Sequence, residues 1–263
     1  MKTTEYIFCI NTGRSGSDYL KGIFESIPSC LAFHEPDPIG NDKTMRQFLQ
    51  GEPEPMRKLA EEKAGLILDL IKEKDKVYVE TNHCFIKGFG WFLPEHLSEK
   101  TMGVVILKRD KNKIAKSLLR IGCSPFVKKG RCWIATPERK DPRVTPPWVF
   151  GSPRISYFIA CFVKKLFRGI SRLSCKVRNK AVSPPQWLTN YEMQCLLWYV
   201  DETDQLTKEY RQKFPHIKYY EISLESLNDL EQVRRMLRFF GIDGGAGLQN
   251  VVGIPTNQRI EHP

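Results

Sequence analysis

The feature that most constrains the fold of this chain is the stretch YIFCINTGRSGSDYL, Tyr6–Leu20. An apolar run, Tyr6–Ile10, breaks into a small polar turn, Asn11–Ser17, and Tyr19 and Leu20 then resume the apolar pattern. A strand that leads through a glycine-bearing turn into a helix aims backbone N–H groups and the positive end of the helix at an anion. The stretch therefore predicts a strand, an anion-binding turn and the start of a helix.

Strands and helices alternate along the rest of the chain. Further strands are predicted at Cys30–His34, Val77–Val79, Met102–Leu107 and Ile217–Ile222. Helices are predicted at Asp18–Ile27, Met56–Lys74, Lys111–Ile121, Ile155–Leu173, Thr189–Phe214 and Ser226–Phe240, with one short helix inside Phe85–Leu97. This alternation is typical of an α/β fold with a mostly parallel central sheet flanked by helices.

The chain of 263 residues is expected to form one domain, residues 1–263. Residues 36–55, 122–153 and the tail from residue 243 are rich in Gly, Pro or polar residues and are expected to be loops. Ligands of parallel sheets bind beyond the carboxyl ends of the strands. Three turns that follow strands, at residues 11–17, 80–83 and 108–117, are therefore the candidate binding region.

The first of these turns does not match the common nucleotide-binding patterns. Aligning Gly16 with the second glycine of G-x-x-x-x-G-K-[ST] places Ser17 at the lysine and Asp18 at the metal-binding hydroxyl residue. The G-x-G-x-x-G pattern fails as well, because only Gly13 and Gly16 are present. What remains is a phosphate-type turn with Arg14 and hydroxyl side chains, which argues against a Mg²⁺-dependent kinase or NTPase.

The turn resembles the 5′-phosphosulfate loop of sulfotransferases that use 3′-phosphoadenosine-5′-phosphosulfate (PAPS). The carbohydrate and tyrosyl-protein branches of that family carry a GRSG[ST] core, and a second signature places Arg after a strand and Ser eight residues later. VVILKRDKNKIAKSLL has Arg109 and Ser117 at this spacing. The resemblance implies a P-loop-like sulfotransferase architecture in which Arg109 and Ser117 bind the 3′-phosphate. Its 5′-phosphosulfate residues would be Gly13, Arg14, Ser15, Gly16 and Ser17.

A sulfuryl group in transit spreads charge over its oxygens, so its transfer needs fixed hydrogen-bond donors and positioning. The turn amides and Arg14 can supply these donors, and no metal is required. An acceptor hydroxyl must also lose a proton, which calls for a general base. Glu35 in HEPDP is the first candidate and His83 in ETNHCF is the second. The choice stays open, and a third alternative is that neither residue is the base. A catalytic glutamate is expected to have a raised pKa in a partly desolvated cleft.

The net charge of +11 is concentrated in one region. Residues 108–185 carry 20 Lys or Arg and 3 Asp or Glu, so the rest of the chain is net acidic. The basic insertion, residues 122–185, includes the helix ISYFIACFVKKLFRGISRL with an aromatic-rich face and Lys164, Lys165, Arg168 and Arg172. Three interpretations compete: a substrate lid for an anionic acceptor, a membrane-surface helix, and an ordinary solvated face. Nucleic acid is disfavoured, because no recognised binding module accompanies the charge.

The eight cysteines are scattered and form no CxxC, which favours reduced structural thiols; a Cys123–Cys132 pair stays open. No apolar run reaches the roughly 18 residues that a membrane span needs, and no leader pattern precedes the first strand. The expected location is the cytoplasm, with association at a membrane surface as a variant. The sequence indicates neither the acceptor nor the oligomeric state.

These patterns lead to one hypothesis and two rivals. The hypothesis is a metal-independent sulfotransferase that moves a sulfuryl group from PAPS to the hydroxyl of a carbohydrate, lipid or other small molecule and releases 3′-phosphoadenosine-5′-phosphate (PAP). The enzyme rival is a divergent P-loop phosphotransferase that binds ATP with Mg²⁺. The non-enzyme rival is a degenerate nucleotide-binding module that docks an anionic surface.

Overall fold

The computed structural model describes residues 4–72, 76–178 and 183–254. The chain divides into two compact units. The first consists of Met1–Gly40, Arg57–Arg109 and Glu209–Pro263, and the second of Asn41–Met56 and Asp110–Lys208. The basic insertion lies within the second unit.

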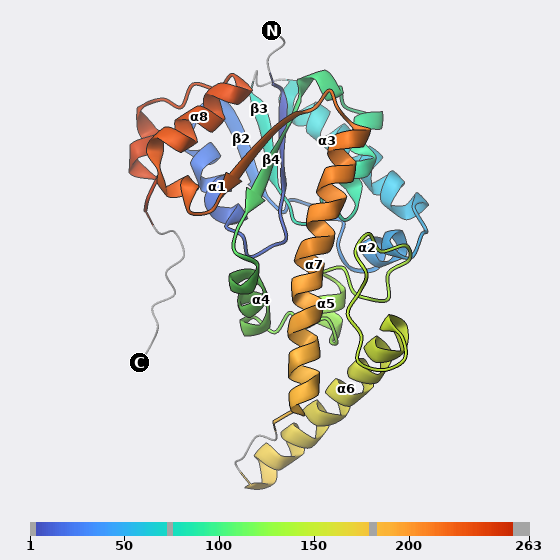
Figure 1. Ribbon diagram of the computed structural model, residues 1–263. Helices are drawn as coiled ribbons and strands as arrows, with labels where there is room; N and C mark the ends of the chain where they lie inside the picture. Colours follow the sequence, from blue (N-terminus) through green and yellow to red (C-terminus); the bar gives the residue numbers. More distant parts are fainter. Residues whose placement is uncertain (1–3, 73–75, 179–182, 255–263) are drawn as a thin grey trace. The chain divides into compact units, whose positions relative to one another are not determined.

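The first unit is built on a five-stranded parallel sheet (Figure 1). Its strands are β1 (Tyr6–Ile10), β2 (Cys30–His34), β3 (Val77–Thr81), β4 (Met102–Lys108) and β5 (Lys218–Ser223), in the spatial order β2-β3-β1-β4-β5. All of β1 is buried, as its continuous apolar run predicts for a central strand. Each pair of neighbouring strands in this sheet runs parallel, so the predicted α/β class with a mostly parallel sheet is confirmed.

Helices cover both faces of this sheet. Figure 1 shows α1 (Ser17–Glu25) and α8 (Leu230–Phe240) on one side and α3 (Glu54–Lys72) on the other. Phe240 packs against Gly103 of β4, where a Cβ would lie 2.6 Å from the phenyl ring. Short 3₁₀ segments complete the unit at Phe89–Trp91, Leu93–Glu95, Glu99–Thr101, Ser226–Asn228 and Ala246–Asn250.

The second unit is helical in the residues that the structure describes. Its elements are α2 (Asp42–Leu49), α4 (Lys111–Arg120), α5 (Lys128–Arg131), α6 (Pro153–Arg178) and the greater part of α7 (Gln186–Lys213). Glu202 of α7 is fully buried and accepts hydrogen bonds from Arg139 Nη1 at 2.6 Å and Val144 N at 2.7 Å. This buried carboxylate therefore attaches the irregular segment that connects α5 with α6 to helix α7.

Several local predictions were wrong. Residues 36–55 were expected to be a loop but contain α2, and residues 122–153 contain the single turn of α5. The short helix expected within Phe85–Leu97 is a pair of 3₁₀ turns.

Cys123 and Cys132 are both free thiols, so the pair that the sequence left open does not form, and the favoured expectation of reduced thiols holds for these two residues. Within the described residues, no helix combines the length and apolar character that crossing a membrane would require.

Candidate functional site

The turn between β1 and α1 is held in a left-handed conformation. Gly13, Arg14 and Gly16 have φ values of 73°, 57° and 95°, and the Asn11 side chain accepts a hydrogen bond from Gly13 N at 2.8 Å. Consecutive turns of this kind line up backbone N–H groups into a concave anion-binding surface. We call residues 11–17 the anion loop.

Gly16 is required at the end of the anion loop for two reasons. Its φ of 95° is unfavourable for residues with a side chain, and a Cβ would lie 2.4 Å from Leu224 Cδ1. Gly16 is also the N-cap of α1 and provides no side-chain cap. The first N–H groups of α1 therefore lack the usual capping oxygen, which an anion can replace.

Ser15 supplies the clearest sign of a missing partner. Its side chain is fully buried, and its hydroxyl has no hydrogen-bond partner in the described part of the chain. Leaving a buried hydroxyl unsatisfied costs about 1–3 kcal/mol, so the position favours a ligand oxygen. Asp18, the acidic residue that departs from the sulfotransferase pattern, is exposed on the first turn of α1.

Arg109 lies against the anion loop because β4 runs parallel beside β1, with Ile10 opposite Ile106. Its Nη1 donates to the carbonyl of Arg14 at 2.6 Å, while its Nε is buried and has no partner among the described residues. Ser117, its predicted companion, is the seventh residue of α4 and belongs to the second unit. The structure thus brings Arg109 to the loop and places Ser117 on the predicted helix.

The two candidate bases, Glu35 and His83, touch each other. Glu35 follows β2 and His83 follows β3, and these strands pair in parallel with His34 opposite Thr81. His83 Nδ1 lies 2.6 Å from Glu35 Oε1. Glu35 has a left-handed φ of 49°, which costs a residue other than glycine of order 1–3 kcal/mol. The neighbouring strand and the histidine hold this carboxylate in a strained, defined position.

Charge and burial assign different states to the pair. Burial raises the pKa of Glu35, but the hydrogen bond from His83 and nearby positive charge outweigh burial and hold the pKa below its usual value. Burial, aided by the charge of Lys87, lowers the pKa of His83 to about 4. At neutral pH Glu35 is therefore ionised, His83 is neutral, and His83 Nδ1–H donates to Glu35. The expectation of a raised pKa for Glu35 was wrong.

The second nitrogen of His83 faces the protein interior. Burial raises the pKa of the Cys84 thiol to about 12, so this thiol keeps its proton and can donate it to His83 Nε2, 3.5 Å away. The His83 side chain is 1% exposed, whereas that of Glu35 is 19% exposed. Of the two, Glu35 is the group that solvent reaches.

The pair lies directly beside the anion loop. A side chain at Gly13 would begin 3.8 Å from His83 Cβ, so the imidazole packs against the loop backbone. The anion loop, Arg109 and the Glu35–His83 pair therefore form one cluster at the carboxyl edge of the sheet, where ligands of parallel sheets bind.

A buried network that the sequence patterns did not predict supports Glu35. Lys63 Nζ donates to Glu80 at 2.9 Å and to the carbonyl of Pro36 at 3.2 Å, and both charged side chains are almost completely buried. Asn82 Nδ2 donates to Glu80 and to the carbonyl of Ile39. These contacts fix the segment that follows Glu35. The helical spacing could have indicated that Lys63 is buried, because it lies on the same face of α3 as the buried residues Ala60, Ala64 and Ile67.

Comparison with known proteins gives similarity in structure only. No family model and no curated protein matches the chain. One similar structure is a sulfotransferase domain from the curacin biosynthetic pathway, with a TM-score of 0.47, 11% identity, and coverage of 95% of this chain and 78% of that one. Another is a sulfotransferase from Alicyclobacillus acidocaldarius, with a TM-score of 0.42, 14% identity, and coverage of 93% and 83%. At this level of similarity, the function is inferred from the site residues.

Proposed function

We propose that this protein is a sulfotransferase that transfers a sulfuryl group from PAPS to an acceptor hydroxyl. The observation that carries the proposal is the position of Glu35. This ionised, partly exposed carboxylate belongs to a pair that packs against an anion loop in which the buried Ser15 hydroxyl has no hydrogen-bond partner among the described residues.

The residues present fit an anionic donor. The amides of the anion loop, the Ser15 hydroxyl and the uncapped start of α1 would hold the 5′-phosphosulfate, with Arg14 and Ser17 at the same loop. Arg109 and Ser117 are assigned to the 3′-phosphate, an assignment that rests on the sequence resemblance. When bound, the donor supplies the sulfuryl group, and fixed donors oriented toward its oxygens stabilise the charge that develops there.

Glu35 is assigned the role of general base and His83 the role of a positioning residue. Glu35 Oε1 accepts a hydrogen bond from His83 Nδ1–H, which leaves Oε2 to accept a proton from an acceptor hydroxyl. The lowered pKa keeps Glu35 in its basic form throughout the neutral range. His83 is neutral, and its second nitrogen faces Cys84, so this histidine orients Glu35.

The acceptor is proposed only as a class, a hydroxyl on a carbohydrate, a lipid or another small molecule. The segments expected to select it are residues 36–55, the basic insertion and the tail from residue 243. The insertion is retained as a candidate substrate lid.

The test is calorimetric titration with PAP, without metal, compared with ATP and Mg²⁺. PAP is expected to bind, and binding of ATP–Mg²⁺ in place of PAP would show that the protein is a P-loop phosphotransferase instead.

The variant Glu35→Gln tests the base, because it keeps the size and hydrogen-bonding capacity of the side chain but cannot accept the proton of the acceptor hydroxyl. This variant should bind PAP normally while sulfate transfer from radiolabelled PAPS to a panel of hydroxyl acceptors collapses. Wild-type protein that binds PAP but sulfates nothing would support the non-enzyme rival.

A further inference from the structure

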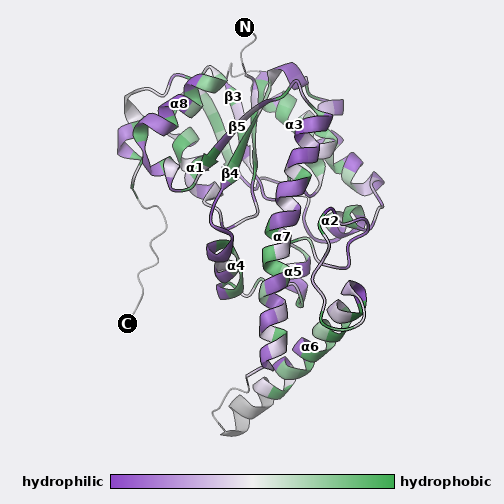
Figure 2. Cartoon of the chain, viewed as in Figure 1, coloured by the Kyte–Doolittle hydropathy of each residue, from purple (hydrophilic) through white to green (hydrophobic). Residues whose placement is uncertain are grey.

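Helix α6 of the second unit exposes a continuous row of large apolar side chains. They recur every three or four residues, which places them on one face of the helix. Phe158 and Phe162 are 59% and 67% exposed. The row consists of Ile155, Phe158, Ile159, Phe162, Leu166 and Ile170. We call it the apolar stripe, and Figure 2 shows the hydrophobic colouring along α6. So much contiguous exposed apolar surface is uncommon on a protein that works alone in water.

The opposite face of α6 is packed, so the rotation of the helix about its axis is fixed. Tyr157 and Ala160 are fully buried in a small core with Phe126 and Tyr191. Tyr157 donates a hydrogen bond to the carbonyl of Pro125 at 3.0 Å. The apolar stripe is therefore what remains outside after this face has been buried.

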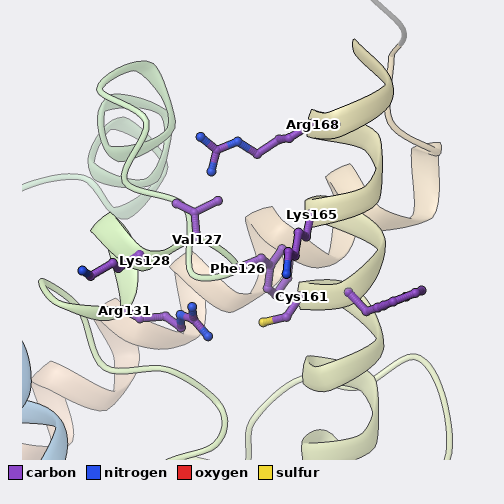
Figure 3. Close-up of a pocket in the computed structure, with 9 residues that line it drawn as sticks. Phe126, Val127, Lys128, Arg131, Cys161, Lys165 and Arg168 are labelled. Atoms are coloured by element: carbon purple, nitrogen blue, oxygen red, sulfur yellow. The ribbon is translucent and has the colours of Figure 1, made fainter. Parts of the chain in front are cut away.

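A basic cavity of about 590 Å³ opens beside the apolar stripe. Figure 3 shows Lys128 and Arg131 on one wall and Lys165 and Arg168 of α6 on another. Among the described residues that line it, these four are cationic and none is acidic. Phe162 belongs both to the cavity wall and to the apolar stripe. We call this space the basic cavity.

Arg131, on the wall of the basic cavity, carries a hydrogen-bond donor suited to an anion. Its Nε is buried and has no hydrogen-bond partner in the described part of the chain. A buried guanidinium donor without an acceptor is costly, and a phosphate oxygen is a strong acceptor for it. The basic cavity therefore fits a phosphate group whose attached chains lie toward the apolar stripe.

We propose that the second unit docks on an anionic lipid surface through α6. The apolar stripe enters the boundary between headgroups and acyl chains, and the basic cavity binds the phosphate of an anionic lipid. An anionic lipid surface is favoured over other partners because it alone matches both the cations and the adjacent apolar side chains. A soluble anion would leave the apolar stripe in water. A symmetric second copy would bring two sets of these cations close together.

Sedimentation with lipid vesicles tests the proposal without donor, acceptor or turnover. The protein is expected to bind vesicles that contain phosphatidylglycerol and phosphatidylcholine far better than vesicles of phosphatidylcholine alone. The double variant Lys165→Gln, Arg168→Gln should bind roughly 30-fold more weakly, from about 1 kcal/mol per cation near a charged surface. The double variant Phe162→Ser, Leu166→Ser should lose more than about tenfold.

Matched controls come from exposed positions outside α6. Lys208→Gln removes a cation from α7, and Leu66→Ser with Leu70→Ser removes exposed leucines from α3. These variants should bind vesicles like the wild type. Equal losses in the controls, or no preference for anionic vesicles, would overturn the proposal. A dimer that forms without lipid, and that Phe162→Ser with Leu166→Ser abolishes, would also overturn the proposal. Inorganic phosphate that binds the basic cavity while vesicles do not bind would point to a soluble anion instead.

Discussion

The hydrogen bond between His83 and Glu35 allows a sharp test, because its removal should move a measurable pKa. His83→Leu deletes the Nδ1 donor, while His83→Asn places an amide N–H close to the position of Nδ1. Burial raises the pKa of Glu35, and the hydrogen bond from His83 is the largest effect that opposes it. Without that donor, burial should dominate.

The magnitude follows from the contact. A hydrogen bond to a charged group contributes about 1.5–3 kcal/mol, and one pKa unit corresponds to about 1.4 kcal/mol. His83→Leu should therefore raise the pKa of Glu35 by about 1–2 units. The rise is limited because Lys87 stays fully buried nearby and keeps favouring the ionised carboxylate. His83→Asn should keep the pKa close to the wild-type value.

The assay is the pH titration of the Glu35 carboxyl ¹³C resonance, assigned with Glu35→Gln, and it needs no acceptor. Once an acceptor is found, the acidic limb of the pH–rate profile should shift upward in His83→Leu by the same amount, since the base works only when ionised. An unchanged or lower pKa for Glu35 in His83→Leu would refute the assigned cause. Thermal melts of both variants check that each is folded.

Three further predictions concern affinity and stability. Ser15→Ala should weaken PAP binding about tenfold or more in calorimetry, because it removes a donor to a charged group, whereas the exposed Ser29→Ala should not. Lys63→Met should lower the free energy of unfolding in urea by about 3–5 kcal/mol by stranding Glu80, and Lys63→Met with Glu80→Gln should recover part of that loss; no recovery would contradict the assigned cause. The folded state disfavours the proton on His83, whose pKa is about 4, so stability should fall as pH drops from about 6.5 to 4. The loss should reach about 3 kcal/mol relative to His83→Asn, and parallel curves would contradict it.

Much of the fold could be predicted from local patterns. The five strands agree with the predicted ranges within two residues at each end, because their apolar runs and neighbouring turns are distinct. Helix α2 was not predicted within residues 36–55, because Gly and Pro flank it and its two buried side chains, Met45 and Leu49, are too few to make a clear helical pattern.

The sequence predicts the members of the candidate site one by one, and the structure shows which of them lie together. The sequence presents Glu35 and His83 as alternative bases, because local patterns do not show that β2 and β3 are neighbours. Their contact depends on that strand order. Lys63 and Lys87 were missed because lysine is rarely fully buried, and partners that allow burial lie elsewhere in the chain. The roles proposed for Arg109 and Ser117 stay predictions.

The contact between Gly16 and Leu224 has a consequence for how the protein is made. The anion loop is synthesised well before Leu224, which packs against it and directly follows β5. Tyr19 of α1 likewise donates its hydroxyl to the carbonyl of Leu227, 208 residues later. A growing chain thus carries the loop sequence long before its packing partners exist. Ability to bind an anion at this loop should therefore appear only when β5 has joined the sheet, which makes binding a readout of completed folding.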